Sequence, residues 1–230
     1  MSDNHWRISQ AESRRRYLLK FDAAEVAAYD GLVGTLAPED LAAYRDDLAE
    51  VWTTAAGQRV LDAGAGTGAF TRVLAGIGGL ELTALEPAPA MLECLRSKPE
   101  LRGVAIVQGF CDHPQDRGHF AGRCFDAICS RQLANGLYDP LSAFRNWRHW
   151  LRPGGILVLV DGLYGREAWT GGWAEEVDVL PLSATQTPAT VAYLLESAGF
   201  AVDTVRPLGR VNARPVTRTR RYVVVARRTE

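Results

Sequence analysis

The chain has 230 residues, of which 47% are hydrophobic and 23% are charged, and its formal net charge at pH 7 is −1. This length suits one α/β domain with a full core, and the near-neutral charge argues against nucleic acid or a membrane surface as the partner. The sequence has no signal-like apolar core and no apolar stretch of membrane-spanning length, so we expect a cytoplasmic protein.

The segment between residues 8 and 55 has helical character. It contains the stretches QAESRRRYLLKF, AAEVAAYDGLVG and PEDLAAYRDDLAEVW. The last of these begins with Pro38 and two acidic residues, which suit the first turn of a helix. We expect residues 1–55 to form a helical cap on a core made by residues 56–230, all within a single domain.

From residue 58 the sequence alternates between strand-like and helix-like segments. Strands are predicted at 58–63, 80–86, 103–109, 125–130, 155–162, 200–206 and 220–227. Helices are predicted from Thr67 onward and at 88–97, 140–151 and 187–199. The alternation predicts a doubly wound α/β fold, in which a parallel sheet is covered on both faces. The stretch 163–186 has no clear element but holds Tyr164, Trp169 and Trp173, so we expect an insertion on the substrate side.

A glycine-rich turn follows the first predicted strand, in VLDAGAGTGAF at residues 60–70. Gly64, Gly66 and Gly68 supply positive φ angles and let a ligand lie directly on the main chain, next to the free N–H groups at the start of a helix. Gly64, Gly66 and Ala69 also satisfy the dinucleotide fingerprint GxGxxG/A. An NAD-dependent oxidoreductase is therefore one interpretation of this turn.

The second predicted strand ends on an acidic residue, Glu86, about twenty residues after the glycines. In doubly wound folds ligands bind at the carboxyl ends of the strands, and an acid at this place accepts hydrogen bonds from ribose hydroxyls. We expect Glu86 to bind a ribose.

Several segments together resemble the class I S-adenosylmethionine-dependent methyltransferases. VLDAGAGTGAF and LEPAPAML resemble the first two motifs of the family, and FDAICS and WLRPGGILVLVD resemble its fourth strand and the approach to its fifth. LLESAGF and RRYVVVARR extend the likeness more loosely to the C-terminus. The resemblance implies a Rossmann-like sheet of seven strands in the order 3-2-1-4-5-7-6, with the last strand antiparallel, and S-adenosyl-L-methionine as the cofactor.

The resemblance also implies how the first strand and its turn bind this cofactor. Its methionyl part would lie against the backbone of Ala63, Gly64 and Gly66. Asp62 would orient the turn and contact the cofactor directly or through water, and Glu86 would bind the ribose hydroxyls. These roles follow from the family resemblance.

Other residues are expected around the adenine and the ammonium group. Pro87 and Met91 would supply apolar cover. The family often has an acid directly after a glycine at the end of the third strand, where this chain has Phe110. We therefore expect Asp112 to accept the adenine amino group, with Phe110 or Cys111 packing on the ring. The main-chain carbonyl of Ser130 would accept a hydrogen bond from the ammonium group.

The loop SRQLANGLYDP, after the fourth predicted strand, faces the reacting methyl group in this family. We expect Arg131 and Tyr138 to bind or polarise the acceptor, and Arg131 would suit an anionic acceptor. A role in fixing the loop is the alternative for both residues. Methyl transfer depends mainly on in-line alignment and the exclusion of water, and a base is needed only when the acceptor must lose a proton early. His149 is expected to be structural.

The N-terminal segment offers aromatic and basic residues that would suit a lid. Its aromatic residues Trp6, Tyr17, Phe21 and Tyr29 are placed to close over the cofactor, and Arg14 to Arg16 to meet its carboxylate. Amphipathic packing explains the aromatic residues nearly as well.

The cysteines do not point to a metal. The four cysteines are Cys94, Cys111, Cys124 and Cys129. They fit no disulfide framework, and we expect them to be reduced. Cys111, His113, His119 and Cys124 lack the close CxxC pairs of structural zinc sites, so we expect no metal.

The acceptor class is narrowed by what the sequence lacks. It has no Asn/Asp-Pro-Pro-aromatic signature of enzymes that methylate nucleic-acid amino groups, and no nucleic-acid-binding module. We expect a small-molecule methyltransferase, of a type found in bacterial secondary metabolism, that is a monomer or a homodimer. The alternatives are the oxidoreductase named above and a non-methylating protein that keeps the cofactor pocket.

Overall fold

The computed structural model describes residues 5–169, 174 and 177–230 and contains one sheet of seven strands. The strands are β1 (Arg59–Ala63), β2 (Glu81–Glu86), β3 (Ala105–Gln108), β4 (Phe125–Arg131), β5 (Leu151–Gly162), β6 (Phe200–Pro207) and β7 (Arg221–Arg228). Their order is β3-β2-β1-β4-β5-β7-β6, and β7 runs antiparallel to both β5 and β6. The predicted strand order and the antiparallel last strand are confirmed.

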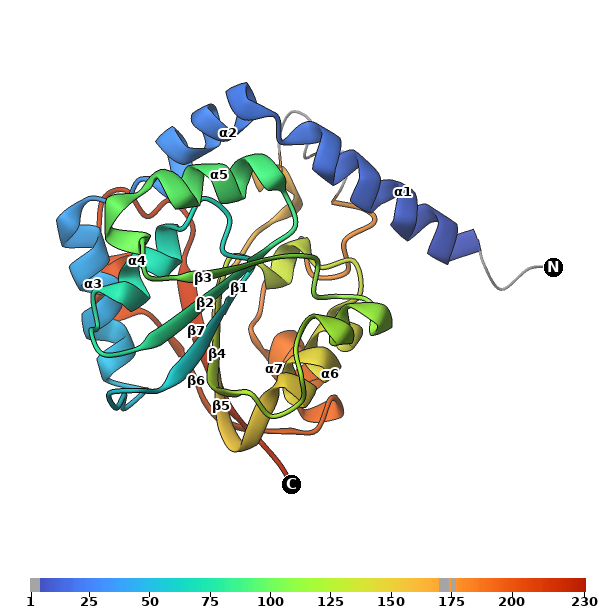
Figure 1. The fold of residues 1–230 in the computed structure, drawn as a ribbon. Helices are drawn as coiled ribbons and strands as arrows, with labels where there is room; N and C mark the ends of the chain where they lie inside the picture. Colours follow the sequence, from blue (N-terminus) through green and yellow to red (C-terminus); the bar gives the residue numbers. More distant parts are fainter. Residues whose placement is uncertain (1–4, 170–173, 175–176) are drawn as a thin grey trace.

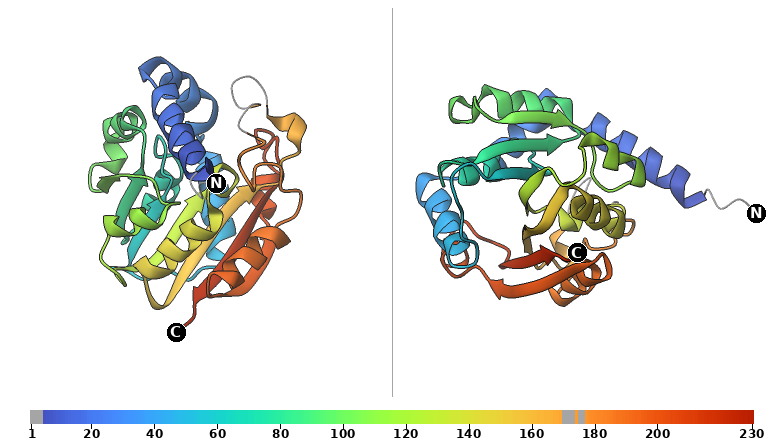
Figure 2. Two further views of the ribbon diagram at one scale, coloured as in Figure 1. Left: turned by 90° about the vertical axis from the view of Figure 1, so that its right-hand side faces the viewer. Right: turned by 60° about the horizontal axis from the view of Figure 1, so that its bottom comes forward.

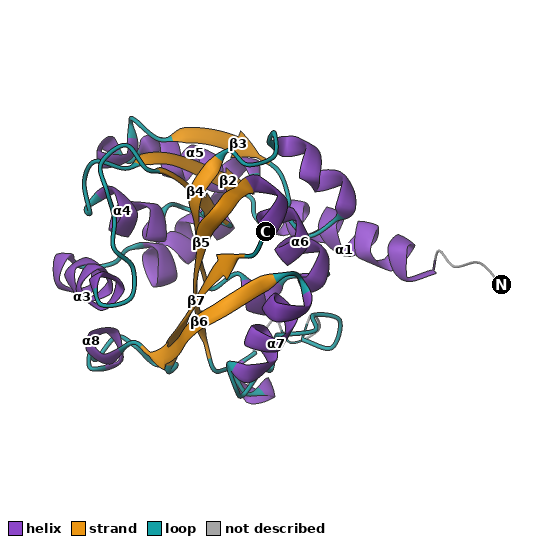
Figure 3. Cartoon of the chain, turned by 90° about the horizontal axis from the view of Figure 1, so that it is seen from below, coloured by secondary structure: helices purple, strands orange, loops and turns teal. Residues whose placement is uncertain are grey.

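Helices cover both faces of the sheet (Figures 1 and 3). On one side lie α3 (Pro38–Ala49), α4 (Ala69–Ala75) and α8 (Gly209–Asn212), and on the other α6 (Pro140–Trp150) and α7 (Ala189–Ser197). Neighbouring residues of β1 serve both cores, since Val60 packs with the α3 side and Leu61 with the α6 side. This arrangement explains why the central strands read as continuous apolar runs.

Helix α6 shows how the local sequence defines an element. Asp139 is its N-cap, accepting the backbone N–H of Ser142 at 2.9 Å, and Pro140 follows at the first helical position. Phe144, Trp147 and Trp150 recur every three residues and are fully buried. The helix α8 was not predicted, and β5 begins at Leu151, four residues before the predicted strand.

The N-terminal helices lie near the carboxyl ends of the central strands. They are α1 (His5–Lys20), α2 (Ala23–Tyr29) and the π-helical turn η1 (Asp30–Gly34). Helix α5 (Pro89–Ser97) packs against β2 and β3. Helices α1 and α2 cross the top of the molecule, and α1 extends beyond the edge of the sheet (Figures 1 and 2). Residues 5–34 thus form a cover, whereas α3 packs with α4 and α8 in the core layer.

A lysine ties this cover to the core. Lys98 Nζ donates to Asp30 Oδ1 at 2.7 Å and to the carbonyl oxygen of Thr67 at 2.6 Å. The contact joins η1, the glycine-rich turn and the end of α5 at one point. Among the described residues, no helix is both long enough and apolar enough to cross a bilayer.

Candidate active site

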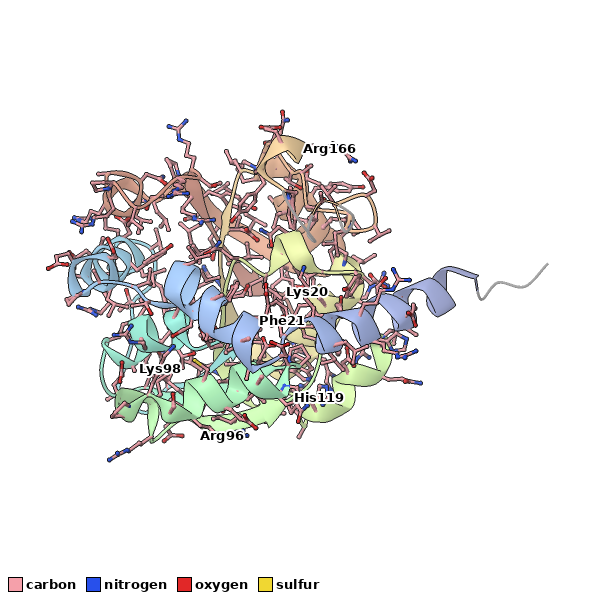
Figure 4. All side chains as sticks on the ribbon, turned by 90° about the horizontal axis from the view of Figure 1, so that it is seen from above. Lys20, Phe21, Arg96, Lys98, His119 and Arg166 are labelled. Carbon is pink, nitrogen blue, oxygen red and sulfur yellow. The ribbon has the colours of Figure 1, made fainter. Side chains whose placement is uncertain are left out.

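A cavity of about 390 Å³ lies at the carboxyl ends of the strands, under α1 and α2. The turn after β1, the ends of β2 and β3, and the loop after β4 form its floor. Tyr17, Phe21 and Tyr29 come from the cover, and Tyr164 and Trp169 come from the segment after β5. Phe21 is buried and lies at the junction of α1 and α2 (Figure 4). The structure therefore brings the predicted cap residues and the floor together around one cavity.

The turn after β1 has the backbone that its glycines predict. Gly64, Gly66 and Gly68 have φ angles of +70°, +55° and +92°. A Cβ atom at Gly64 would lie 2.8 Å from the side chain of Leu133, so any larger residue there would force Leu133 to move. A Cβ atom at Gly66 would have only the sulfur of Met91 nearby, at 3.8 Å. Gly66 therefore presents bare backbone to the cavity.

Glu86 faces this turn from the end of β2. Its Oε2 accepts the backbone N–H of Gly66 at 3.1 Å, and its Oε1 accepts that of Ala88 at 2.9 Å and, more weakly, the hydroxyl of Tyr17 at 3.5 Å. Burial raises the pKa of Glu86 to about 7. A carboxylate has about four acceptor positions, so Oε2 keeps one free position, and on Oε1 a ligand hydroxyl would replace the weak bond from Tyr17.

Asp62 lies beneath the turn and is fully buried. Its Oδ2 accepts the hydroxyl of Thr71 at 2.6 Å, which ties β1 to α4, while Oδ1 has no partner among the described residues. Burial raises the pKa of Asp62 to about 7. Asp62, Ala63 and Ser130 do not line the cavity, and Ala63 lies beside Ser130 in the sheet. Their predicted contacts with the cofactor stay predictions.

The predicted adenine side is closed by a contact from α1. Arg14 forms an ion pair with Asp112, whose Oδ2 also accepts the backbone N–H of Tyr138 at 2.7 Å. The Arg14 guanidinium carbon lies 4.7 Å from the ring centroid of Phe110. Burial raises the pKa of Asp112, although the charge of Arg14 opposes that shift. Asp112 and Phe110 line the cavity, and their predicted contacts with the adenine stay predictions.

The other residues predicted for this side are also placed. Pro87, Met91 and Cys111 line the cavity, and Met91 packs with Phe21 in a small buried cluster. Burial raises the pKa of the Cys111 thiol well above its usual value, which makes it a neutral packing group. No three His, Cys, Asp or Glu side chains are gathered for a metal ion in the described part of the chain.

The predicted basic contact of the N-terminal segment differs from expectation. Arg14 is paired with Asp112 and Asp116, and Arg15 and Arg16 are exposed beside Glu12. None of the three arginines lines the cavity. They are therefore not placed to meet a cofactor carboxylate. Trp173 and the side chain of Trp6 lie outside the described part of the structure.

The acceptor side of the cavity is built on the loop after β4. Arg131 lines the cavity, and its Nε donates to the hydroxyl of Tyr44 at 3.2 Å. Tyr138 also lines it, and its hydroxyl donates to the carbonyl oxygen of Ser13 at 3.2 Å, which connects the loop to α1. The structure thus places both residues that were predicted to bind the methyl acceptor at the cavity. Tyr138 is also hydrogen-bonded to α1.

A polar group on this side was not predicted. The side-chain amide of Gln132 donates to the hydroxyl of Tyr164 at 2.9 Å, and Arg221 donates to the same oxygen. Gln132 has a φ angle of +56°, a conformation that is uncommon outside glycine. The sequence indicates Tyr164 only because it lies in the predicted insertion. No sequence pattern predicts the left-handed backbone conformation of Gln132.

Sequence comparison identifies the type of domain. A model of the methyltransferase domain family matches residues 61–159. The chain is 34% identical over 166 residues to an uncharacterized methyltransferase of Mycobacterium tuberculosis, covering 72% of this chain and 60% of that protein. It is 32% identical over 101 residues to a ubiquinone biosynthesis O-methyltransferase of Methylocella silvestris, covering 44% of this chain and 38% of that protein. The chain thus spans less than two thirds of these relatives.

Solved structures share the fold at low identity. A SAM-dependent methyltransferase from Aquifex aeolicus has a TM-score of 0.64 and 19% identity, covering 90% of this chain and 99% of that one. A phosphoethanolamine N-methyltransferase from Haemonchus contortus, in complex with S-adenosylhomocysteine, has a TM-score of 0.67 and 16% identity, covering 92% and 58%. The [4+2]-cyclase SpnF has a TM-score of 0.61 and 17% identity, covering 81% and 80%.

Proposed function

The chain belongs to the class I S-adenosylmethionine-dependent methyltransferases, and from this we propose that it transfers a methyl group from S-adenosylmethionine to a small-molecule acceptor. The observation that carries the proposal is the position of Glu86, whose carboxylate is hydrogen-bonded to the bare backbone of Gly66 at the wall of the cavity. A bound nucleoside needs a carboxylate to accept hydrogen bonds from its ribose hydroxyls, and it needs bare backbone because a side chain would occupy its space.

The residues around the cavity would bind, orient and shield the reactants. When bound, S-adenosylmethionine supplies a methyl group on a sulfonium that is already a good leaving group. Glu86 and the turn at Gly64 to Gly66 hold the nucleoside end, while Tyr17, Phe21 and Tyr29 cover it and keep water out. The loop after β4, with Arg131 and Tyr138, holds the acceptor in line with the methyl group.

The size and walls of the cavity support a small acceptor. A volume of about 390 Å³ must hold the reactants, and Tyr29, Tyr164 and Trp169 give the acceptor side flat aromatic walls. Since one relative is an O-methyltransferase, hydroxylated aromatic compounds are the first acceptors to test. Small-molecule metabolism, secondary metabolism included, supplies acceptors of this class.

Calorimetry with S-adenosylmethionine and with NADH tests the cofactor. We expect micromolar binding of S-adenosylmethionine and none of NADH, whereas the reverse would support the oxidoreductase reading. A second candidate function, a non-methylating protein with the same pocket, is kept because a cyclase shares the fold. Release of S-adenosylhomocysteine with a library of hydroxylated aromatic compounds separates the two, because only a methyltransferase produces it.

A further inference from the structure

One positively charged side chain lines the cavity. Among the described lining residues, Arg131 alone is an arginine or lysine. It is the last residue of β4, and its register partner in β5 is Val160. Its neighbours from other elements are aromatic, because the Arg131 guanidinium carbon lies 5.4 Å from the ring centroid of Tyr44, and Tyr29 and Tyr164 line the same cavity.

Arg131 has no carboxylate partner in the described part of the chain. Its one hydrogen bond there runs from Nε to the hydroxyl of Tyr44, at 3.2 Å, and Arg131 takes part in none of the ion pairs found among the described residues. The two terminal nitrogens of the guanidinium therefore have no partner among these residues. Asp62 interacts with Arg131 electrostatically, but its carboxyl is bonded to Thr71 and forms no hydrogen bond or ion pair with the guanidinium.

Two other partly buried arginines have acidic partners. Arg14 pairs with Asp112, and Arg214 pairs with Asp40 at 2.6 Å. A guanidinium that is withdrawn from water without a counter-ion costs free energy, and tyrosine hydroxyls and rings offset only part of that cost. Arginine also remains charged at all relevant pH values. Glu86 and Asp112 also line the cavity, so the guanidinium of Arg131 stabilises an anion only at its own end of the cavity.

We propose that Arg131 is the carboxylate-binding residue of the cavity, forming paired hydrogen bonds through its two terminal nitrogens with a carboxylate that a ligand brings in. Two ligands of the proposed function can supply this group, the methionyl end of S-adenosylmethionine or an acidic acceptor, and the inference rests on that function. The planar fork of arginine matches a carboxylate in both cases. Since Arg14 to Arg16 do not line the cavity, they do not compete for the role.

The first arm of the test compares S-adenosylmethionine with decarboxylated S-adenosylmethionine, which lacks only the carboxylate. Calorimetry gives the ratio of the two dissociation constants for the wild type, Arg131→Met and Arg131→Lys. If the cofactor supplies the carboxylate, the wild type prefers S-adenosylmethionine by about 10- to 100-fold. Arg131→Met then brings the ratio close to one, and Arg131→Lys gives an intermediate value.

The second arm compares 4-fluorobenzoate with 4-fluorobenzamide by fluorine NMR, on protein saturated with S-adenosylhomocysteine. If the acceptor supplies the carboxylate, the wild type prefers the benzoate by about tenfold, and Arg131→Met loses that preference. Arg227→Met is the matched control, because Arg227 is exposed on β7 and pairs with Asp203 at 2.7 Å. That control should leave both ratios unchanged.

A ratio that depends on Arg131 in either arm supports the proposal and identifies the source of the carboxylate. Ratios near one in the wild type for both pairs, or ratios that Arg131→Met leaves unchanged, would overturn it. Failure of the wild type to bind either nucleoside would instead contradict the proposed function. The fluorobenzoate arm, run on free protein, then still tests whether Arg131 binds a carboxylate.

Discussion

The carboxylate of Glu86 accepts the backbone N–H of Gly66 at 3.1 Å, so the acid at the end of β2 is aimed at the turn that follows β1. The bond fixes the side chain on the cavity rather than in solvent, because Glu86 is only 2% exposed. It also satisfies the N–H group of Gly66, which would otherwise need another acceptor. The geometry of the nucleoside site therefore depends on this pair.

Removing the carboxylate should weaken cofactor binding strongly. Glu86→Ala deletes the acceptor for two ribose hydroxyls and leaves the N–H groups of Gly66 and Ala88 without their partner. We expect the dissociation constant of S-adenosylmethionine to rise about 100-fold, measured by calorimetry. Glu81→Ala is the control, since Glu81 is exposed at the other end of the same strand. Similar affinities for both variants would show that Glu86 does not bind the ribose.

A glycine-to-alanine substitution, which adds one methyl group, tests whether the ligand lies on the bare backbone of the turn. Gly66→Ala adds a Cβ atom to the cavity, whereas Gly57→Ala adds one at a position with nothing within 4 Å. Both glycines have positive φ angles, so each variant should lose about 1–2 kcal/mol of unfolding free energy. Only Gly66→Ala should lose cofactor affinity, by about tenfold or more. Equal affinities would mean that no ligand lies on this part of the backbone.

The pH dependence of binding follows from the burial of Glu86. Its pKa of about 7 leaves the carboxyl partly protonated near neutrality. Ribose hydroxyls donate to the ionised form, so affinity for S-adenosylmethionine should rise from pH 5.5 to 8, by up to about tenfold per pH unit below 7. Calorimetry across this range measures the slope, which Glu86→Gln should flatten. An affinity that falls as the pH rises would contradict this role.

The stability of the ligand-free protein should change in the opposite direction. Burial raises the pKa values of Glu86 and Asp62 to about 7 and that of Asp161 to about 6, all above their usual values. Such groups contribute stability that is full below their unfolded-state pKa and is lost as the pH rises through the folded-state value. The melting temperature should therefore decrease between pH 5 and 8 through these groups. Saturating S-adenosylmethionine should reduce that decrease.

The attachment of α1 depends on Arg14. Arg14→Met removes the partner of the buried carboxylate of Asp112, and Arg15→Met makes the same change at an exposed position of the same helix. We expect amide hydrogens of α1 to exchange about tenfold faster in Arg14→Met, because the helix detaches more often. Those of the central strands should not change. Equal exchange in the two variants would show that the Arg14 contact does not hold the cover.

The sheet and the nucleoside side of the site could be predicted from the sequence because their signals are local. The glycines after β1 and the acid at the end of β2 are short patterns, and alternation of strands and helices brings the two together at one edge. The order of the seven strands followed from the family resemblance. Gly64 is also closely packed against the side chain of Leu133, a contact that no local sequence pattern predicts.

The cover and the acceptor side could not be predicted in the same way. The pair of Arg14 and Asp112 joins residues 98 positions apart, and their pairing depends on where α1 packs. The hydrogen bond from Lys98 to Asp30 also joins residues far apart in the sequence, so no local pattern predicts it. The left-handed backbone of Gln132 is set by its surroundings after β4 rather than by its residue type. Such contacts are decided by tertiary packing.

A crystal structure with S-adenosylhomocysteine tests the central claim most directly. We expect the ribose hydroxyls to lie within hydrogen-bond distance of the Glu86 carboxylate and the homocysteine part to rest on the backbone of Gly64 to Gly66. A nucleoside bound elsewhere, or a ribose with no contact to Glu86, would contradict it.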